Sequence, residues 1–282
     1  MGFELWDGFE IRFYGITMAI AVLVAFLVIS HAMKKENYKD DLPLYLLILC
    51  VPLGVIGGRI FFVIFSTDRV NLFDIRNGGL AIYGSILICI LAVYIFSRIK
   101  KVGFFTIVDF IVPGLILAQA IGRWGNFFNI MGGHYEVFGL ATGDFHFFPL
   151  TVLIGGKPHL STWLYESILS FVGFFLLWRL LRAKKENGDR KHKFGTVTAV
   201  YFIFHGTVRA ILEPLREDAL TLFGDNSFFM NRISFLISIA LVAVGLVILY
   251  LNKKGKISQD NRNIIKSNVV EKEEEGAHVY KG

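Results

Sequence analysis

The segment GRWGNFFN at residues 122–129 combines a guanidinium, two amides and two glycines at the end of an apolar run. That run is long enough to cross most of a bilayer, so these groups stand where a membrane helix reaches the interface. Ionisable side chains at this depth are costly in lipid and usually face a polar cavity or a ligand. Gly125 has no side chain and would let an anionic headgroup approach the backbone. The segment therefore predicts a lipid-phosphate site with Arg123, Asn126 and Asn129.

A second group of polar residues lies near the end of a later apolar run. His205, Arg209, Glu213 and Arg216 are spaced four, four and three apart, which places them on one helical face. Pro214 breaks or kinks that helix. Glu213 can orient Arg209 and still leave guanidinium donors for a phosphate, whose oxygens match the planar fork of arginine. Two arginine sites on one side of a membrane imply an anionic lipid as the ligand.

Smaller groups at the expected helix ends on that side add to this pattern. They are Tyr14-Gly15, Gly57-Gly58-Arg59, the stretch 78–84 that contains Tyr83, and the stretch 161–166. Two plainer interpretations stay open. Tyrosines at this depth are often interfacial belt residues, and glycines also permit close helix packing. Arg59, Arg123 and Arg209 could also simply neutralise carboxylates in structural pairs, for which the candidates are Asp109, Glu166 and Glu213.

The elements that position these residues are predicted to be membrane helices. Of the 282 residues 54% are apolar and only 18% are charged, with a mean hydropathy of +0.57, which excludes an ordinary soluble domain. Seven segments approach the roughly 20 residues that a spanning helix needs. They are 11–33, 42–67, 80–97, 104–122, 160–181, 195–215 and 230–252. The predicted fold class is an all-α polytopic membrane protein with seven transmembrane helices.

The loop charges predict how these helices cross the membrane. Basic residues gather after the first, third, fifth and seventh segments, which places the N-terminus outside and the C-terminus in the cytoplasm. Residues 1–252 form the transmembrane domain, and 123–159 form a long external segment with a small cap. Residues 253–282 form a polar, disordered cytoplasmic tail.

Other classes of function have less support in the composition. The net charge of +6 does not indicate a nucleic-acid partner, because the basic residues are distributed over alternating loops. Cys50 and Cys89 lie inside apolar runs without metal-ligand spacing, so we interpret them as packing residues. No motif calls for a metal, a nucleotide or another cofactor.

Taken in order, these motifs resemble the bacterial prolipoprotein diacylglyceryl transferases. Besides GRWGNFFN the resemblance rests on RFYG at 12–15, GGRIFFVIF at 57–65, GGLAIYG at 78–84, STWLYES at 161–167 and RAILEPLREDAL at 209–220. It covers the chain to about residue 252 and looks closest to Gram-positive-type members, in which a Tyr follows GGLAI.

The resemblance implies an enzyme of the bacterial cytoplasmic membrane with its active site toward the external face. Such enzymes transfer the diacylglyceryl group of phosphatidylglycerol to the lipobox cysteine of a preprolipoprotein, forming a thioether and releasing glycerol phosphate. By resemblance Arg123 would bind the phosphate and Arg209 would stabilise the departing glycerol phosphate. The expected binding residues are Tyr14, Arg59, Gly125, Asn126, Asn129, Glu213 and Arg216.

The general base that forms the thiolate is left open between two residues. Tyr83 takes the position where other members have a catalytic His, and His205 lies one turn from Arg209, where the family usually has a Tyr. A further departure is Met131, two positions after Asn129, where the family usually has a Glu. The alternatives to the enzyme are a non-catalytic lipid-binding paralogue and a transporter of an anionic solute, which would place its arginines near mid-membrane.

Overall fold

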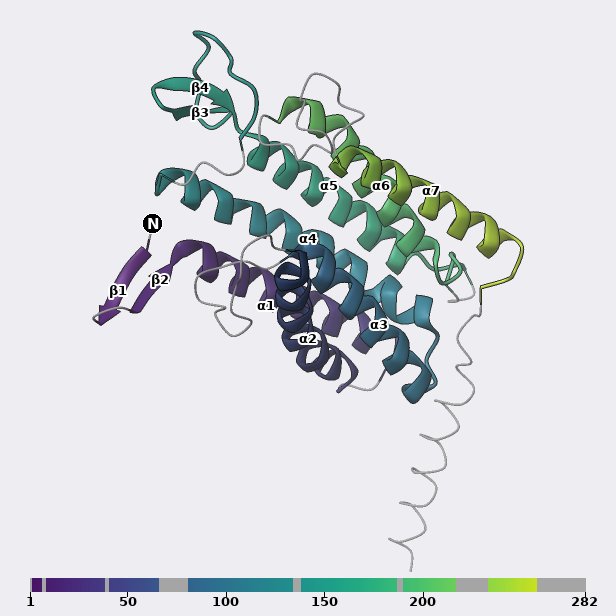
Figure 1. Ribbon diagram of the computed structural model, residues 1–282. Coiled ribbons are helices and arrows are strands. Elements are labelled where there is room, and N and C mark those ends of the chain that lie inside the picture. The colour runs from purple at the N-terminus through teal and green to yellow at the C-terminus, as the bar shows by residue number, and fades with distance from the viewer. Residues whose placement is uncertain are drawn as a thin grey trace, which may run out of the picture. The chain divides into compact units, whose positions relative to one another are not determined.

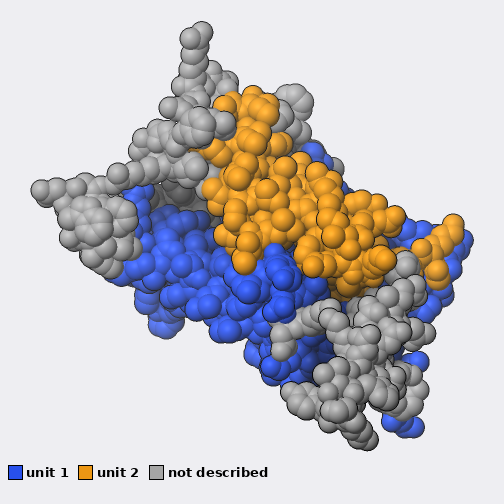
Figure 2. Space-filling model, turned by 90° about the horizontal axis from the view of Figure 1, so that it is seen from below, with its two compact units in different colours: residues 1–47, 109–254 blue, residues 48–108, 255–282 orange. Residues whose placement is uncertain are grey.

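The computed structural model describes residues 2–6, 9–38, 41–65, 81–133, 138–186, 190–216 and 233–257. The chain divides into two compact units, which Figure 2 shows in different colours. Unit 1 comprises residues 1–47 and 109–254, and unit 2 comprises residues 48–108 and 255–282. Parts of the predicted motifs, including residues 78–80, 134–137 and 217–220, and most of the predicted tail lie outside the described residues.

The described residues are mostly helical (Figure 1). The helices are α1 (Phe13–Lys35), α2 (Leu42–Phe65), α3 (Ile82–Lys100), α4 (Phe104–Met131), α5 (Thr162–Arg182), α6 (Thr196–Leu212), the short 3-10 helix η1 (Glu213–Leu215) and α7 (Ile233–Lys253). Two antiparallel hairpins accompany them, which the all-α prediction did not include. They are β1 (Gly2–Trp6) with β2 (Phe9–Arg12), and β3 (Thr151–Ile154) with β4 (Lys157–Leu160).

The helices bear out a polytopic membrane protein. Within the described residues, six helices are long and apolar enough to cross a membrane, namely α1, α2, α3, α4, α5 and α7. Helix α6 has 17 residues and is not among these six, so the seventh span stays a prediction. The predicted helix boundaries agree with the structure to within three residues, with one exception in α4.

That exception is the signature segment itself. We expected the helix to end at residue 122 and an external segment to follow, but α4 continues through the segment to Met131. The physical reason is burial, because the added turns pack against other parts of unit 1. Phe127 lies 5.0 Å from the Trp163 ring centroid, and Ile130 belongs to a buried cluster with Val152 and Trp163. Tertiary contacts therefore extend this helix beyond the apolar run.

Helices α1 and α4 pack closely along glycines in unit 1. A Cβ atom at Gly114 would come within 2.8 Å of the Ile29 side chain, and one at Gly125 within 2.8 Å of the Tyr14 ring. Because the residue number rises along α4 as it falls along α1, the two helices are antiparallel. Small residues of this kind let membrane helices approach each other. The packing brings the start of α1 to the signature segment.

Helices α5, α6 and α7 run alongside one another in unit 1 (Figure 1). Two glycines hold α6 against α7: a Cβ atom at Gly206 would lie 2.7 Å from the Ser238 carbonyl oxygen, and one at Gly245 2.7 Å from that of Ala199. Pro214 falls in η1, directly after α6, so the predicted helix break is confirmed. This break redirects the chain between Arg209 and Arg216.

Asp109 caps the beginning of α6 from helix α4. Its Oδ2 accepts the Gly195 N–H at 2.9 Å, and its Oδ1 accepts the Thr198 N–H at 2.8 Å and the Thr198 hydroxyl at 2.5 Å. The sequence offers Asp109 as one candidate partner for an arginine of the site. It instead satisfies orphan donors at a helix N-terminus and ties α6 to α4.

Replacing Asp109 with alanine is expected to lower the free energy of unfolding by roughly 2 kcal/mol, because capping is lost and buried donors are left unsatisfied. Thermal unfolding in detergent measures the change. Asp144→Ala, which removes an exposed carboxylate, is the matched control and should leave Tm unchanged. Equal Tm values for the two variants would contradict the capping role.

In unit 2, helices α2 and α3 are in close contact. A Cβ atom at Gly57 would lie 2.5 Å from Cγ1 of Ile88, and the Ser85 hydroxyl donates to the Gly54 carbonyl at 2.7 Å. The Cys89 thiol lies 3.4 Å from the carbonyl oxygen of residue 50, and both cysteines are free. These thiols thus pack between two helices, as predicted.

Unit 2 also holds two of the predicted site residues. Arg59 is buried on α2, with its guanidinium carbon 5.6 Å from the Phe62 ring centroid. Tyr83 lies in the first turn of α3 and is 37% exposed. Their parts in substrate binding and catalysis remain predictions.

Candidate functional site

The buried carboxylate of Glu166, in the first turns of α5, is the centre of a charged cluster in unit 1. Its Oε1 accepts a hydrogen bond from Arg209 Nη1 on α6 at 2.7 Å, and its Oε2 forms an ion pair with Arg123 on α4. Arg216, directly after η1, places its Nη1 3.5 Å from the same Oε1. One carboxylate therefore joins three guanidiniums from three segments of the chain. We call these four residues, together with Glu213, the arginine cluster.

Glu213 is the second carboxylate of the cluster and is completely buried. Its Oε2 lies 3.5 Å from Arg209 Nη2, at the i,i+4 spacing that the sequence indicated. The predicted pairing is therefore present, but the shorter contact of Arg209 is with Glu166. Three guanidiniums and two carboxylates leave the cluster with a formal charge of +1.

Exposure divides the cluster into an accessible and an inaccessible part. The Arg123 side chain is 27% exposed and that of Arg209 is 20%, whereas that of Glu166 is only 6%. Both arginines do form the ion pairs that the sequence suggested. The cluster nevertheless keeps an excess positive charge, and its two partly exposed side chains are both arginines. Guanidinium donors match the oxygens of a phosphate. This arrangement can bind an anionic headgroup.

His205 lies beside the cluster, one turn before Arg209 on α6. Its imidazole stacks on the Tyr201 ring with centroids 5.6 Å apart and planes inclined by 14°. It lies within electrostatic range of Arg123, Arg209 and Glu166. One of the two candidate bases therefore lies near the two arginines that the sequence predicted to be catalytic.

Tyr14 reaches the cluster from the start of α1. Its ring is 38% exposed, packs against Gly125 and lies within electrostatic range of Arg123. The space beside Gly125, which we expected a headgroup to use, is thus occupied by this ring. Asn126 and Asn129 follow Arg123 at intervals of three residues on α4 and are both half-buried.

Hydrogen bonds fix α4 against α5 next to the Arg123–Glu166 pair. The Trp124 indole N–H donates to the Ser167 hydroxyl at 3.2 Å, and that hydroxyl donates to the Ala120 carbonyl at 2.8 Å. Because Ser167 directly follows Glu166, these bonds fix the turn of α5 that carries the central carboxylate.

The segment after α4 holds Arg216 in place. Gly139 forms a β-bridge with Arg216, and its N–H donates to the Leu160 carbonyl at 2.9 Å. The next residue, Leu140, donates its N–H to the Leu215 carbonyl at 2.9 Å. The predicted cap region is thus partly ordered, and its β4 strand and the chain after η1 are linked through these bonds.

Sequence reasoning did not include Glu166 among the site residues. It named the residue as one of three carboxylates that could neutralise an arginine, and as part of the stretch 161–166 at a helix end. The available signal was a carboxylate inside an apolar helix, which is expensive in lipid unless a cation pairs with it. The spacing of residues could not show that three arginines share this one partner.

The chain is similar in sequence to known proteins of one family. The family model described as prolipoprotein diacylglyceryl transferase matches residues 1–251. Curated relatives named phosphatidylglycerol–prolipoprotein diacylglyceryl transferase include one from Finegoldia magna, 33% identical over 90% of this chain and 96% of its own. Another, from Clostridium perfringens, is 35% identical over 88% of this chain and 93% of its own. This chain belongs to the prolipoprotein diacylglyceryl transferase family.

Proposed function

We propose that this enzyme transfers the diacylglyceryl group of phosphatidylglycerol to the lipobox cysteine of a prolipoprotein. The observation that carries the proposal is the arginine cluster, which combines two partly exposed arginine side chains with buried carboxylates in a multi-pass membrane protein of this family. Net positive charge fits the phosphate of the lipid. The nucleophile arrives with the protein substrate, so the packed thiols of unit 2 are not required.

The reaction displaces a phosphate group from carbon. The cysteine sulfur attacks the carbon of the diacylglyceryl group that bears the phosphate, and the electron pair of the broken C–O bond stays on the phosphate oxygen. Glycerol phosphate leaves, and the thiol proton passes to a general base. Charge grows on the leaving oxygens, and Arg123 and Arg209 are placed to stabilise it because other residues already fix their guanidiniums.

The ends of the helices favour an external site. The cluster residues lie late in α4, early in α5 and late in α6. Because successive helices run in opposite directions, these three positions are at the same end of the helices. The basic residues Lys34 and Lys35 end α1, whose opposite end carries Tyr14. By the positive-inside rule the basic ends are cytoplasmic, so the cluster faces outward, and we retain seven spans with the N-terminus outside.

Placement at helix ends also favours the enzyme over a transporter, which would need its arginines near mid-membrane and open to both sides. The non-catalytic paralogue is favoured only by the altered family pattern after Asn129, in Met131 and in the changed loop around it. Met131 lies exposed at the last position of α4. Activity on a lipobox peptide separates that paralogue from the enzyme.

The direct test supplies the protein in detergent with phosphatidylglycerol and a lipobox peptide, and detects the product by mass spectrometry. We expect a thioether-linked diacylglyceryl peptide and glycerol phosphate in equal amounts. A peptide with serine in place of the cysteine is the control and should give no product. Absence of product from folded protein would reject the transferase and support a lipid-binding paralogue.

We propose His205 as the general base, because it lies one turn before Arg209 on α6 and within electrostatic range of Arg123 and Arg209. His205→Phe keeps a ring that can stack on Tyr201 and is expected to lower kcat by about a hundredfold or more. The rise of rate with pH that deprotonation of the base produces should also disappear. If His205→Phe keeps full activity and its pH profile while Tyr83→Phe loses both, the base is Tyr83.

A further inference from the structure

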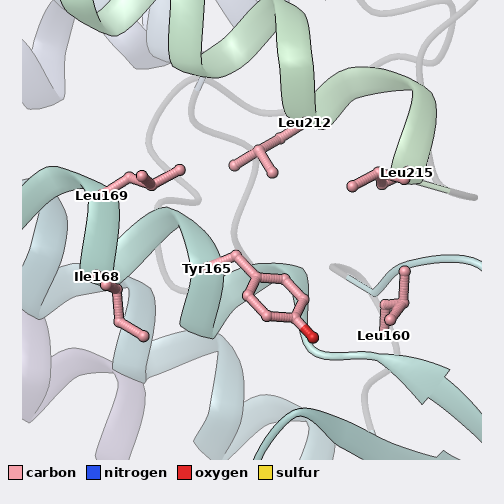
Figure 3. A pocket seen from close by; sticks show the side chains of 6 residues that line it. All are labelled: Leu160, Tyr165, Ile168, Leu169, Leu212 and Leu215. Carbon is pink, nitrogen blue, oxygen red and sulfur yellow. The ribbon is translucent and has the colours of Figure 1, made fainter.

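An apolar groove lies between α5, α6 and the β3–β4 hairpin in unit 1 (Figure 3). It has a volume of about 450 Å³ and is lined by Leu160, Tyr165, Ile168, Leu169, Leu212 and Leu215. The one side-chain polar group of this lining, the Tyr165 hydroxyl, donates to the Leu150 carbonyl at 2.9 Å. The groove therefore offers a surface for hydrocarbon.

The groove and the arginine cluster belong to the same turns of the chain. Tyr165 directly precedes Glu166 on α5, and Leu212 and Leu215 flank Glu213 where α6 passes into η1. Ile168 at its edge is 51% exposed on a helix that is apolar enough to span a membrane. A single ligand with an anionic head and an apolar chain fits this combination.

We propose that the groove holds one acyl chain of the phospholipid whose phosphate lies on the arginine cluster, and that Leu169 and Leu212 set the preferred chain. This inference rests on the proposed function and adds a subsite to it. The apolar residues of the protein substrate are the competing occupant. A peptide carries backbone donors and acceptors that need partners, and side chains of this lining offer none beyond the engaged Tyr165 hydroxyl. A hydrocarbon chain has no such requirement.

The first experiment narrows the groove with Leu169→Trp and compares phosphatidylglycerols of different chain length. We expect kcat/KM for the dipalmitoyl lipid to fall about tenfold or more, because burial of several methylenes is lost, while the dihexanoyl lipid keeps its wild-type value. Leu246→Trp makes the same change on α7 at a residue that is 55% exposed and does not line the groove. It should change neither value. An equal loss for both lipids in Leu169→Trp would overturn the proposal.

The second experiment does not depend on turnover. Phosphatidylglycerol with a diazirine in one acyl chain is photolysed with the protein, and labelled peptides are mapped by mass spectrometry. We expect labels within residues 160–169 and 212–215 that disappear in Leu169→Trp. If wild-type protein that is active in transfer is labelled only at other residues, the proposal that the groove holds an acyl chain is wrong. If the lipid labels the groove but the protein gives no transfer, the proposed function is rejected and a lipid-binding site remains. A lipobox peptide that carries a diazirine is the second probe. If this peptide labels the groove and the lipid does not, the groove binds the peptide.

Discussion

Replacing Arg123 with alanine is expected to lower diacylglyceryl transfer by at least about a hundredfold, because a preorganised donor to the developing phosphate charge is removed. The loss should appear in kcat as well as in kcat/KM, since the charge grows mainly in the transition state. The peptide assay with phosphatidylglycerol measures both. Arg123 is suited to this role because Glu166 holds its guanidinium while its side chain stays 27% exposed.

Two further variants separate chemistry from folding in this experiment. Arg123→Lys keeps the charge but loses the planar fork, so it should restore only part of the activity. Arg179→Ala removes a basic residue from the last turn of α5, at the opposite end from Glu166, and should leave transfer unchanged. Wild-type activity in a folded Arg123→Ala protein would remove Arg123 from the mechanism.

Glu166→Gln is expected to lower the free energy of unfolding by about 3 kcal/mol, because it removes the buried carboxylate that three guanidiniums share as their counter-charge. The Glu166 side chain is only 6% exposed and contacts Arg123, Arg209 and Arg216, so water has little access to the position of the lost charge. Transfer should fall as well, since the two accessible guanidiniums are then no longer held together. Thermal unfolding and the peptide assay on the same preparation report both effects.

The matched control is Glu36→Gln, which removes another carboxylate with an ion pair. Glu36 lies 2.8 Å from the Lys184 ammonium, whose side chain is 44% exposed and can be solvated after the change. A much smaller loss of stability is expected there, with transfer unchanged. Equal losses of stability and of transfer in the two variants would show that the contacts of Glu166 with three arginines contribute no more than an ordinary ion pair.

The sequence was sufficient to predict the class of the protein and its helices. Long apolar runs reveal membrane helices because hydrocarbon requires each segment to satisfy its own backbone. The helical period also placed Arg209 and Glu213 correctly, since the i,i+4 relation depends only on local geometry. The family followed from the motifs, and the matching relatives confirm it.

The sequence did not reveal the full length of α4 or the role of Asp109. The sequence predicted that the helix ends at residue 122, where polar residues interrupt the apolar run, but Phe127 and Ile130 find buried partners near β3 and the start of α5. Asp109 looked like a counter-charge, whereas three hydrogen bonds use it as a helix cap. In both cases the deciding partners are distant in sequence.

Residue types and spacing by themselves determined where the membrane helices lie and that arginines stand at their ends. Hydropathy and helical period are properties of a single segment, which a sequence displays directly. Only the tertiary structure decided that Arg123, Arg209 and Arg216 share Glu166, and that an apolar groove begins beside it. Arg209 and Glu166 are 43 residues apart, and helix packing alone brings such charges within 2.7 Å.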